Sequence, residues 1–123
     1  MNHDVHYGLT PADPRNFSGT AFTRMMASAE ESEAIKLYYV RFEAGARTFW
    51  HAHGGRQILI VTAGRCRYQR DGEDAVEIVA GESVTFEEGE RHWHGAADDE
   101  AAEHIAVNLG VRETDWFEEV VLG

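Results

Sequence analysis

Short runs of β-type residues recur along most of the chain, and this recurrence restricts the fold more than any other feature of the sequence. The runs are rich in Val, Ile, Tyr and Phe, which are enriched in strands. Most of them are separated by glycine or by Asp-Gly, which favour turns. They cover residues 20–26, 34–42, 56–64, 65–70, 75–80, 83–88, 91–95 and 103–109. The pattern predicts an all-β sandwich or barrel.

The rest of the chain adds little regular structure to this prediction. The segment RETDWFEEVV, residues 112–121, favours a short C-terminal helix with Thr114 as a candidate N-cap. The chain has 123 residues and two prolines, both before residue 15, and shows no internal repeat or low-complexity linker. We therefore expect one domain over residues 1–123, with an irregular segment over about residues 1–18.

Charge and hydropathy restrict the partners and the location. A formal net charge of −11 repels phosphate backbones and argues against nucleic acid as a partner. The longest uncharged apolar run, residues 58–63, is too short to span a bilayer. Residues 1–17 have neither a basic start nor an apolar stretch, so no secretory signal is predicted. The single cysteine, Cys66, agrees with a reducing compartment, and the expected location is the cytoplasm.

Both faces of the segment over residues 58–61 are apolar. If one strand continues through the Gly54-Gly55 bend, then His51, His53, Gln57, Leu59 and Val61 share one face, because side chains alternate along a strand. Ile58 and Ile60 then point the other way and also need to be covered. A second sheet or a partner subunit would cover them, and we expect a homodimer or homotetramer.

The histidines are concentrated in three places. His51 and His53 belong to one predicted strand, His92 and His94 follow about forty residues later, and His104 lies in the last strand. An H-x-H pair on one strand face, with a further histidine from a neighbouring strand, can converge on a metal ion through imidazole nitrogens. This combination predicts a metal site more strongly than any one H-x-H would.

The spacing of glycines and histidines resembles the cupin family. Gly45 precedes His51 by five intervening residues, three separate His53 from Gln57, and six separate Gln57 from Gly64; downstream, Gly81 and Gly89 precede His92. The resemblance implies a double-stranded β-barrel, or jelly roll, with His51, His53, Gln57 and His92 as metal ligands. Three residues depart from the family pattern: Gln57 stands in place of glutamate, Glu87 in place of proline and Ala96 in place of asparagine.

The glutamine at the ligand position bears on the chemistry. With three neutral imidazoles, a glutamate would leave a divalent ion near +1, whereas an amide oxygen leaves it near +2. The ion becomes a stronger Lewis acid, and the missing negative charge disfavours a trivalent state. Lyase or hydrolytic chemistry is therefore favoured over dioxygen chemistry. Mn(II), Fe(II), Ni(II) and Zn(II) all suit this donor set.

A narrower resemblance covers nearly the whole chain. The segments FEAGARTFWHAH, QILIVTAG, GERHWHGAA and DWFEEV are similar to the small bacterial cupins that act as manganese-dependent (R)-hydroxynitrile lyases. This resemblance implies Mn(II) and a pocket that is lined by Tyr38, Val40, Thr48, His94, His104 and Asn108. Strand parity agrees for several of them, since Tyr38 shares a face with Val40 and His104 with Asn108.

These observations predict a metal-dependent lyase that cleaves cyanohydrins into a carbonyl compound and hydrogen cyanide. The metal would lower the pKa of the substrate hydroxyl, and His94 or His104 would take its proton. For both histidines, a role in orienting a ligand or a place in the core is the alternative. An Fe(II) cupin oxygenase and a non-catalytic small-molecule-binding cupin are the alternative functions.

Overall fold

The computed structural model describes residues 7–29, 35–110 and 114–121, and these residues contain β-strands and no helix. The strands are β1 (Thr10–Pro11), β2 (Phe17–Ser18), β3 (Ala21–Ala29), β4 (Ile35–Phe42), β5 (Arg47–Thr48), β6 (His51–His53), β7 (Gln57–Arg70), β8 (Val76–Val79), β9 (Ser83–Phe86), β10 (His92–Ala96), β11 (Ala102–Leu109) and β12 (Thr114–Trp116). The all-β prediction is confirmed. No helix in the described residues is long and apolar enough to cross a membrane.

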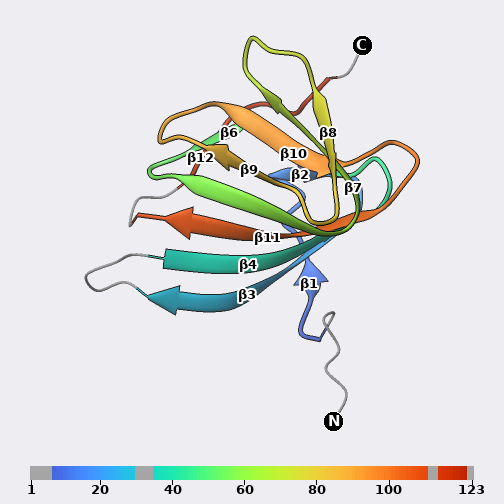
Figure 1. Cartoon of the computed structure of the whole chain (residues 1–123), viewed down its shortest axis with the longest axis horizontal. Helices are drawn as coiled ribbons and strands as arrows, with labels where there is room; N and C mark the ends of the chain where they lie inside the picture. The colour runs from blue at the N-terminus through green and yellow to red at the C-terminus, as the bar shows by residue number, and fades with distance from the viewer. Residues whose placement is uncertain (1–6, 30–34, 111–113, 122–123) are drawn as a thin grey trace.

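The strands form a curled antiparallel sheet in which β7 is shared between two halves (Figure 1). One half consists of β1, β3, β4, β11, β9 and the first part of β7. The other consists of β2, β5, β6, β8, β10, β12 and the second part of β7. This arrangement is the jelly-roll barrel that the resemblance implies.

Gly64 is the point at which β7 passes from one half to the other. The sequence predicts two strands here, over residues 56–64 and 65–70, but the structure joins them into one. Gly64 has a φ of +71°, and a Cβ atom at this position would collide with the carbonyl oxygen of Ala101. Glycine therefore bends the strand without ending it, because it alone adopts this conformation at so close an approach.

The predicted strand from His51 to Val61 is interrupted. β6 ends at His53, and β7 begins at Gln57 in the other half of the barrel. A Cβ atom at Gly55 would collide with the carbonyl oxygen of Leu109, so the chain crosses between the halves in tight backbone contact. Within β7 the predicted alternation is confirmed, since Gln57, Leu59 and Val61 are at most 3% exposed and Ile60 is 39% exposed.

The C-terminal helix prediction is wrong within the described residues. Residues 114–116 form strand β12, which pairs with β6, and residues 117–121 have no regular structure. Residues 112 and 113, which also belonged to the predicted helix, lie outside the described residues. Thr114 lies opposite His53 and Trp116 opposite His51 in this pairing, so long-range contacts override the local preference for a helix.

The core borders the histidines from two sides. Phe42 and Phe86 are fully buried, and each belongs to a separate cluster of apolar side chains. Phe42 packs against the rings of His94 and His104, and Phe86 stacks on the ring of His92. The barrel interior therefore holds the imidazole rings in a largely apolar surrounding.

Candidate metal centre

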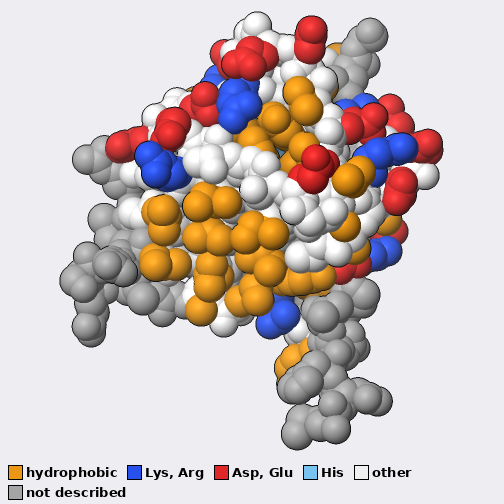
Figure 2. Space-filling view, in the orientation of Figure 1, with side chains coloured by type: hydrophobic (Ala, Val, Ile, Leu, Met, Phe, Trp, Pro, Cys, Tyr) orange, Lys and Arg blue, Asp and Glu red, His pale blue; other side chains and the backbone are white. Residues whose placement is uncertain are grey.

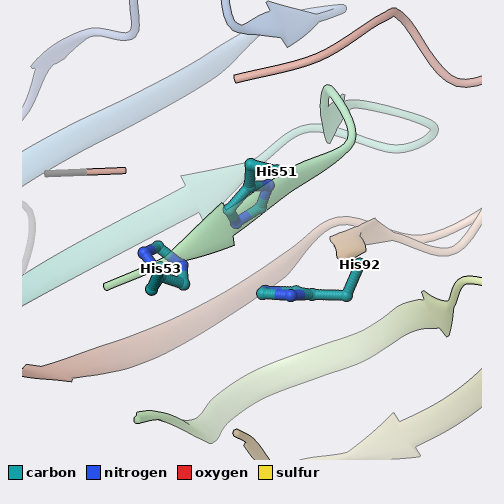
Figure 3. A group of neighbouring side chains, drawn as sticks. All are labelled: His51, His53 and His92. Atoms are coloured by element: carbon teal, nitrogen blue, oxygen red, sulfur yellow. The ribbon is translucent and has the colours of Figure 1, made fainter. Parts of the chain in front are cut away.

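His51, His53 and His92, called here the histidine group, form the centre of the candidate site. His51 and His53 project from β6, and His92 begins the neighbouring strand β10 directly opposite His51 (Figure 3). One ring nitrogen of each residue lies within 4.8 Å of the other two. His51 and His92 are buried and His53 is half-buried. Three imidazoles at this separation can hold a divalent metal ion.

The Nδ1 atoms of all three rings have hydrogen-bond partners, so Nε2 is the nitrogen that each ring offers to a metal. His51 Nδ1 lies 2.9 Å from the carbonyl oxygen of Phe49, and His92 Nδ1 lies 2.8 Å from that of Glu90. A carbonyl oxygen can only accept, so in both rings Nδ1 carries the proton and Nε2 a lone pair. Such partners orient the ligating rings of metal sites.

His53 has a different partner and an unpaired nitrogen. Its Nδ1 lies 3.0 Å from the hydroxyl oxygen of Thr114. Its Nε2 is buried and has no hydrogen-bond partner among the described residues. A buried polar atom without a partner needs an explanation, and a metal bond to this nitrogen supplies one.

Gln57 directs its oxygen toward the histidine group. Its Oε1 lies 3.0 Å from Nε2 of His92, and its Nε2 donates a 2.8 Å hydrogen bond to Oδ1 of Asn108. Because Asn108 accepts from the amide nitrogen, the amide oxygen is the atom left to meet a metal. The side chains that the resemblance implies as ligands therefore lie together, and they fit a hard divalent ion with a neutral donor set.

Burial keeps the five described histidines neutral near pH 7. Desolvation lowers the pKa of His53 to about 4 and that of His92 to about 3. It also lowers the pKa of His104 to about 4, and the pKa values of His51 and His94 lie well below the usual 6.5. Neutral imidazole is the form that binds metal ions and accepts protons.

Sequence reasoning missed three residues that hold the histidine group in place. Phe86 stacks on His92 with ring centroids 3.7 Å apart, and Trp116 packs on His51 with centroids 4.7 Å apart. Thr114 is the third, through its contact with His53. The alternation of residues 83–86 could have indicated that Phe86 points inward. The contacts of Trp116 and Thr114 depend on the pairing of β12 with β6, for which the sequence has no local signal.

A pocket of about 610 Å³ opens beside the histidine group and reaches His53. Of the six residues predicted to line a pocket, the structure places five in its wall, namely Tyr38, Val40, Thr48, His94 and Asn108. The sixth, His104, is fully buried behind His94, with its Nε2 3.2 Å from His94 Nδ1. The backbone N–H of His94 donates to the hydroxyl oxygen of Thr48 at 3.2 Å.

Comparisons with known proteins agree with this architecture. Residues 38–108 match the family model of the cupin domain. The chain is 43% identical over 115 residues to an (R)-mandelonitrile lyase from Granulicella tundricola, covering 92% of this chain and 86% of that protein. It superposes on a cupin-like protein from Thermotoga maritima with a TM-score of 0.91 and 35% identity, covering 97% of this chain and 92% of the other. A polyketide cyclase from Streptomyces resistomycificus, at 16% identity, a TM-score of 0.74 and coverage of 100% and 87%, shares the fold.

Proposed function

The chain belongs to the cupin family, and on that premise we propose that it is a metal-dependent lyase that cleaves cyanohydrins into a carbonyl compound and hydrogen cyanide. In this proposal His51, His53, Gln57 and His92 hold one divalent ion, which we take to be Mn(II). The similarity to an (R)-mandelonitrile lyase over most of both chains supports the reaction class. The neutral donor set supports Lewis-acid chemistry.

The observation that carries the proposal is that one pocket reaches both a member of the histidine group and a separate pair of polar groups. His53 contributes to one part of the wall, and His94 and Thr48 contribute to another. A small hydroxyl compound in this pocket can therefore meet a metal ligand sphere, a neutral imidazole and a hydroxyl group at once. General acid–base chemistry requires this proximity.

The residues of the pocket divide the reaction between them. A bound divalent ion would supply the Lewis acidity that lowers the pKa of the substrate hydroxyl. When His94 donates from Nδ1 to Nε2 of His104, its own Nε2 keeps a lone pair that accepts the hydroxyl proton. The electrons of the O–H bond form the carbonyl, the C–CN bond breaks, and cyanide leaves with its electron pair. Thr48 already accepts the N–H of His94, so its hydroxyl hydrogen is free to donate to the departing cyanide.

Cleavage of mandelonitrile by the manganese-loaded protein tests this function. We expect benzaldehyde and cyanide to appear in equal amounts without uptake of oxygen. His94→Gln should lower kcat by about a hundredfold or more, as removal of a general base does, while the metal content is unchanged. Oxygen consumption without cyanide release would instead identify an oxygenase. Unchanged turnover by the His94 variant would remove His94 from the mechanism.

We place this activity in the cytoplasm. Cys66 is the only cysteine of the chain and is buried, so the chain can form no internal disulfide. This agrees with a reducing compartment. Burial raises the pKa of its thiol to about 12, so the nucleophilic thiolate is scarce at neutral pH. Fractionation of the source cells, with detection of the protein by antibody, would test the location.

A further inference from the structure

Lys36 is the only lysine of the chain, and it lies on the inner face of the barrel. The sequence has 22 acidic residues against 11 lysines and arginines, so cations are scarce in this molecule. A lysine in the pocket is therefore a candidate for ligand binding. Lys36 of β4 lies directly opposite Asn108 of β11, which lies opposite Gln57 of β7. Opposed residues on adjacent strands point to the same face. Lys36, Asn108 and Gln57 therefore form one row that leads from the pocket wall to the histidine group.

A second cavity, the side pocket, meets the larger pocket at this row and has a volume of about 60 Å³. Both cavities are lined by Lys36, Tyr38, His53, Asn108 and Thr114. Lys36, Tyr38 and Thr114 bring an ammonium and two hydroxyl groups. The amide oxygen of Asn108 accepts from Gln57, which leaves its NH₂ group to donate. None of the described residues that line the side pocket is acidic.

The Lys36 ammonium has no counter-ion in the described residues. Among the described residues, Asp13 is the one acidic residue in the wall of the larger pocket, and it is already bound by Arg15 at 2.8 Å. No ion pair or hydrogen bond of Lys36 is present within residues 7–29, 35–110 and 114–121. Lys36 is half-buried in the pocket wall, so an anion that enters the pocket would meet a cation that no described residue neutralises.

We infer that the ligand of this pocket carries a carboxylate, which binds Lys36 and the neutral donors of the side pocket while its reacting end lies at the histidine group. The small volume and the combination of one cation with neutral donors suit a carboxylate, whose two oxygens both accept hydrogen bonds. Binding of the carboxylate does not depend on any reaction. If the proposed function holds, the substrate is a cyanohydrin that carries a carboxylate, and this second step rests on that function.

A pair of ligands that differ in one charge tests the inference by binding alone. The ligands are 4-formylbenzoate and its methyl ester, and their affinities for the manganese-loaded protein are measured by calorimetry. We expect the carboxylate to bind about tenfold more tightly than the ester, and the difference to shrink with added salt. Lys36→Met should abolish the preference, and Lys36→Arg should keep most of it. Arg65→Gln removes an equal charge outside both cavities and should leave the preference unchanged.

Equal affinity for acid and ester in the unsubstituted protein, or a preference that persists in Lys36→Met, would overturn the inference. The cyanohydrins of the same two aldehydes separate this result from a failure of the proposed function. A preference in binding with no cyanide release from either compound would refute the lyase and leave the carboxylate site standing. Cyanide release from both at the same kcat/KM would refute the carboxylate site and support the lyase.

Discussion

At the scale of single residues, Gln57 differs from its neighbours because it offers a neutral oxygen whose direction is set by Asn108. The amide nitrogen donates to Oδ1 of Asn108 at 2.8 Å, so Oε1 is turned toward His92. A carboxylate at this position would bring two oxygens against that acceptor, and Asn108 would need to rotate its own amide to donate instead. A change in the charge of residue 57 would therefore also change the hydrogen bond to Asn108 that orients its side chain.

Gln57→Glu should preserve metal binding and weaken catalysis. The substitution is nearly isosteric, but the added negative charge offsets the pull of the ion on the substrate hydroxyl. We expect a folded, metal-loaded variant whose cyanohydrin cleavage is slower by about tenfold or more, equivalent to roughly 1.4 kcal/mol in the barrier. Elemental analysis and cyanide release measure the two properties. Full lyase activity with intact metal would show that the neutral charge of the amide is unimportant.

Thr114 should contribute to metal affinity through His53. The backbone carbonyls that orient His51 and His92 cannot be removed by substitution, whereas the Thr114 hydroxyl can. We expect Thr114→Val to weaken Mn(II) binding by about tenfold or more, in the range typical of residues that orient metal ligands. Thr114→Ser keeps the hydroxyl and should bind Mn(II) nearly as the unsubstituted protein does. Competition with a chelator measures both, and equal loss in the two variants would point to packing of the threonine methyl group.

The buried histidines should make the metal-free protein sensitive to acid. The pKa of His104 falls from 6.5 to about 4 on burial, so between these values the unfolded chain binds a proton that the folded chain does not. Stability is therefore complete above about pH 6.5 and is lost as the pH falls toward 4. From pH 7.5 to 5.5 this one residue should cost about 1.4 kcal/mol of unfolding free energy. Urea titrations should show that His104→Gln loses less unfolding free energy over that interval than the unsubstituted protein does. An identical loss in the two proteins would show that His104 does not cause the acid sensitivity.

At the scale of elements, the sequence locates the long strands, but it misses β1, β2, β5 and β12 and predicts two connections wrongly. Alternation and glycine spacing locate most strands, because those signals are local. Whether Gly64 ends or bends a strand depends on how closely Ala101 approaches it, and the break between His53 and Gln57 depends on the approach of Leu109 to Gly55. Both are contacts between distant parts of the chain. The histidines of the candidate site were identifiable for the opposite reason, since their residue types and spacing are chemical signals that need no packing.

Gly64→Ala should destabilise the barrel strongly. The residue has a φ of +71°, and the new Cβ atom would collide with backbone atoms of Ala101, which cannot move as a side-chain end can. Gly72→Ala is the matched control, because its φ is +84° and a Cβ atom there would meet open space. We expect the control to lose about 1 kcal/mol from backbone strain alone, and Gly64→Ala to lose at least about 3 kcal/mol. Urea unfolding measures both, and equal losses would show that the collision is relieved by backbone movement.

At the scale of the whole molecule, the outer face of the half-barrel that contains β4, β11 and β7 carries an apolar patch. Ile105 lies between Tyr39 and Ile60 across these strands, and Val107 lies between Leu37 and Ile58. Figure 2 shows hydrophobic side chains gathered over this region of the surface, with acidic and basic side chains mostly around it. We call the six residues of these two rows the outer apolar face, namely Leu37, Tyr39, Ile58, Ile60, Ile105 and Val107. It is the feature that the sequence indicated when it showed β7 to be apolar on both sides.

We propose that a second copy of this chain covers the outer apolar face. With a net charge of −11, two copies repel each other wherever their acidic surfaces meet. The two rows of the outer apolar face carry no charged side chain, so two copies can meet there with the least repulsion. Their contact would also bury apolar area, which favours association. A twofold axis through the face would place each row against its counterpart, as in most homodimers.

We therefore expect a homodimer, or a tetramer built from such dimers, at micromolar concentration. Ile60→Glu should shift it to monomers, because the substitution places a charge from each copy in the buried contact, while a side chain that is 39% exposed in one copy tolerates the change without unfolding. Val76→Glu is the matched control, since Val76 is 43% exposed on β8 and lies outside the outer apolar face. Sedimentation velocity measures the masses and circular dichroism the folding. If the unsubstituted protein sediments as a monomer, or if Val76→Glu dissociates it as Ile60→Glu does, then the outer apolar face is not the contact between copies.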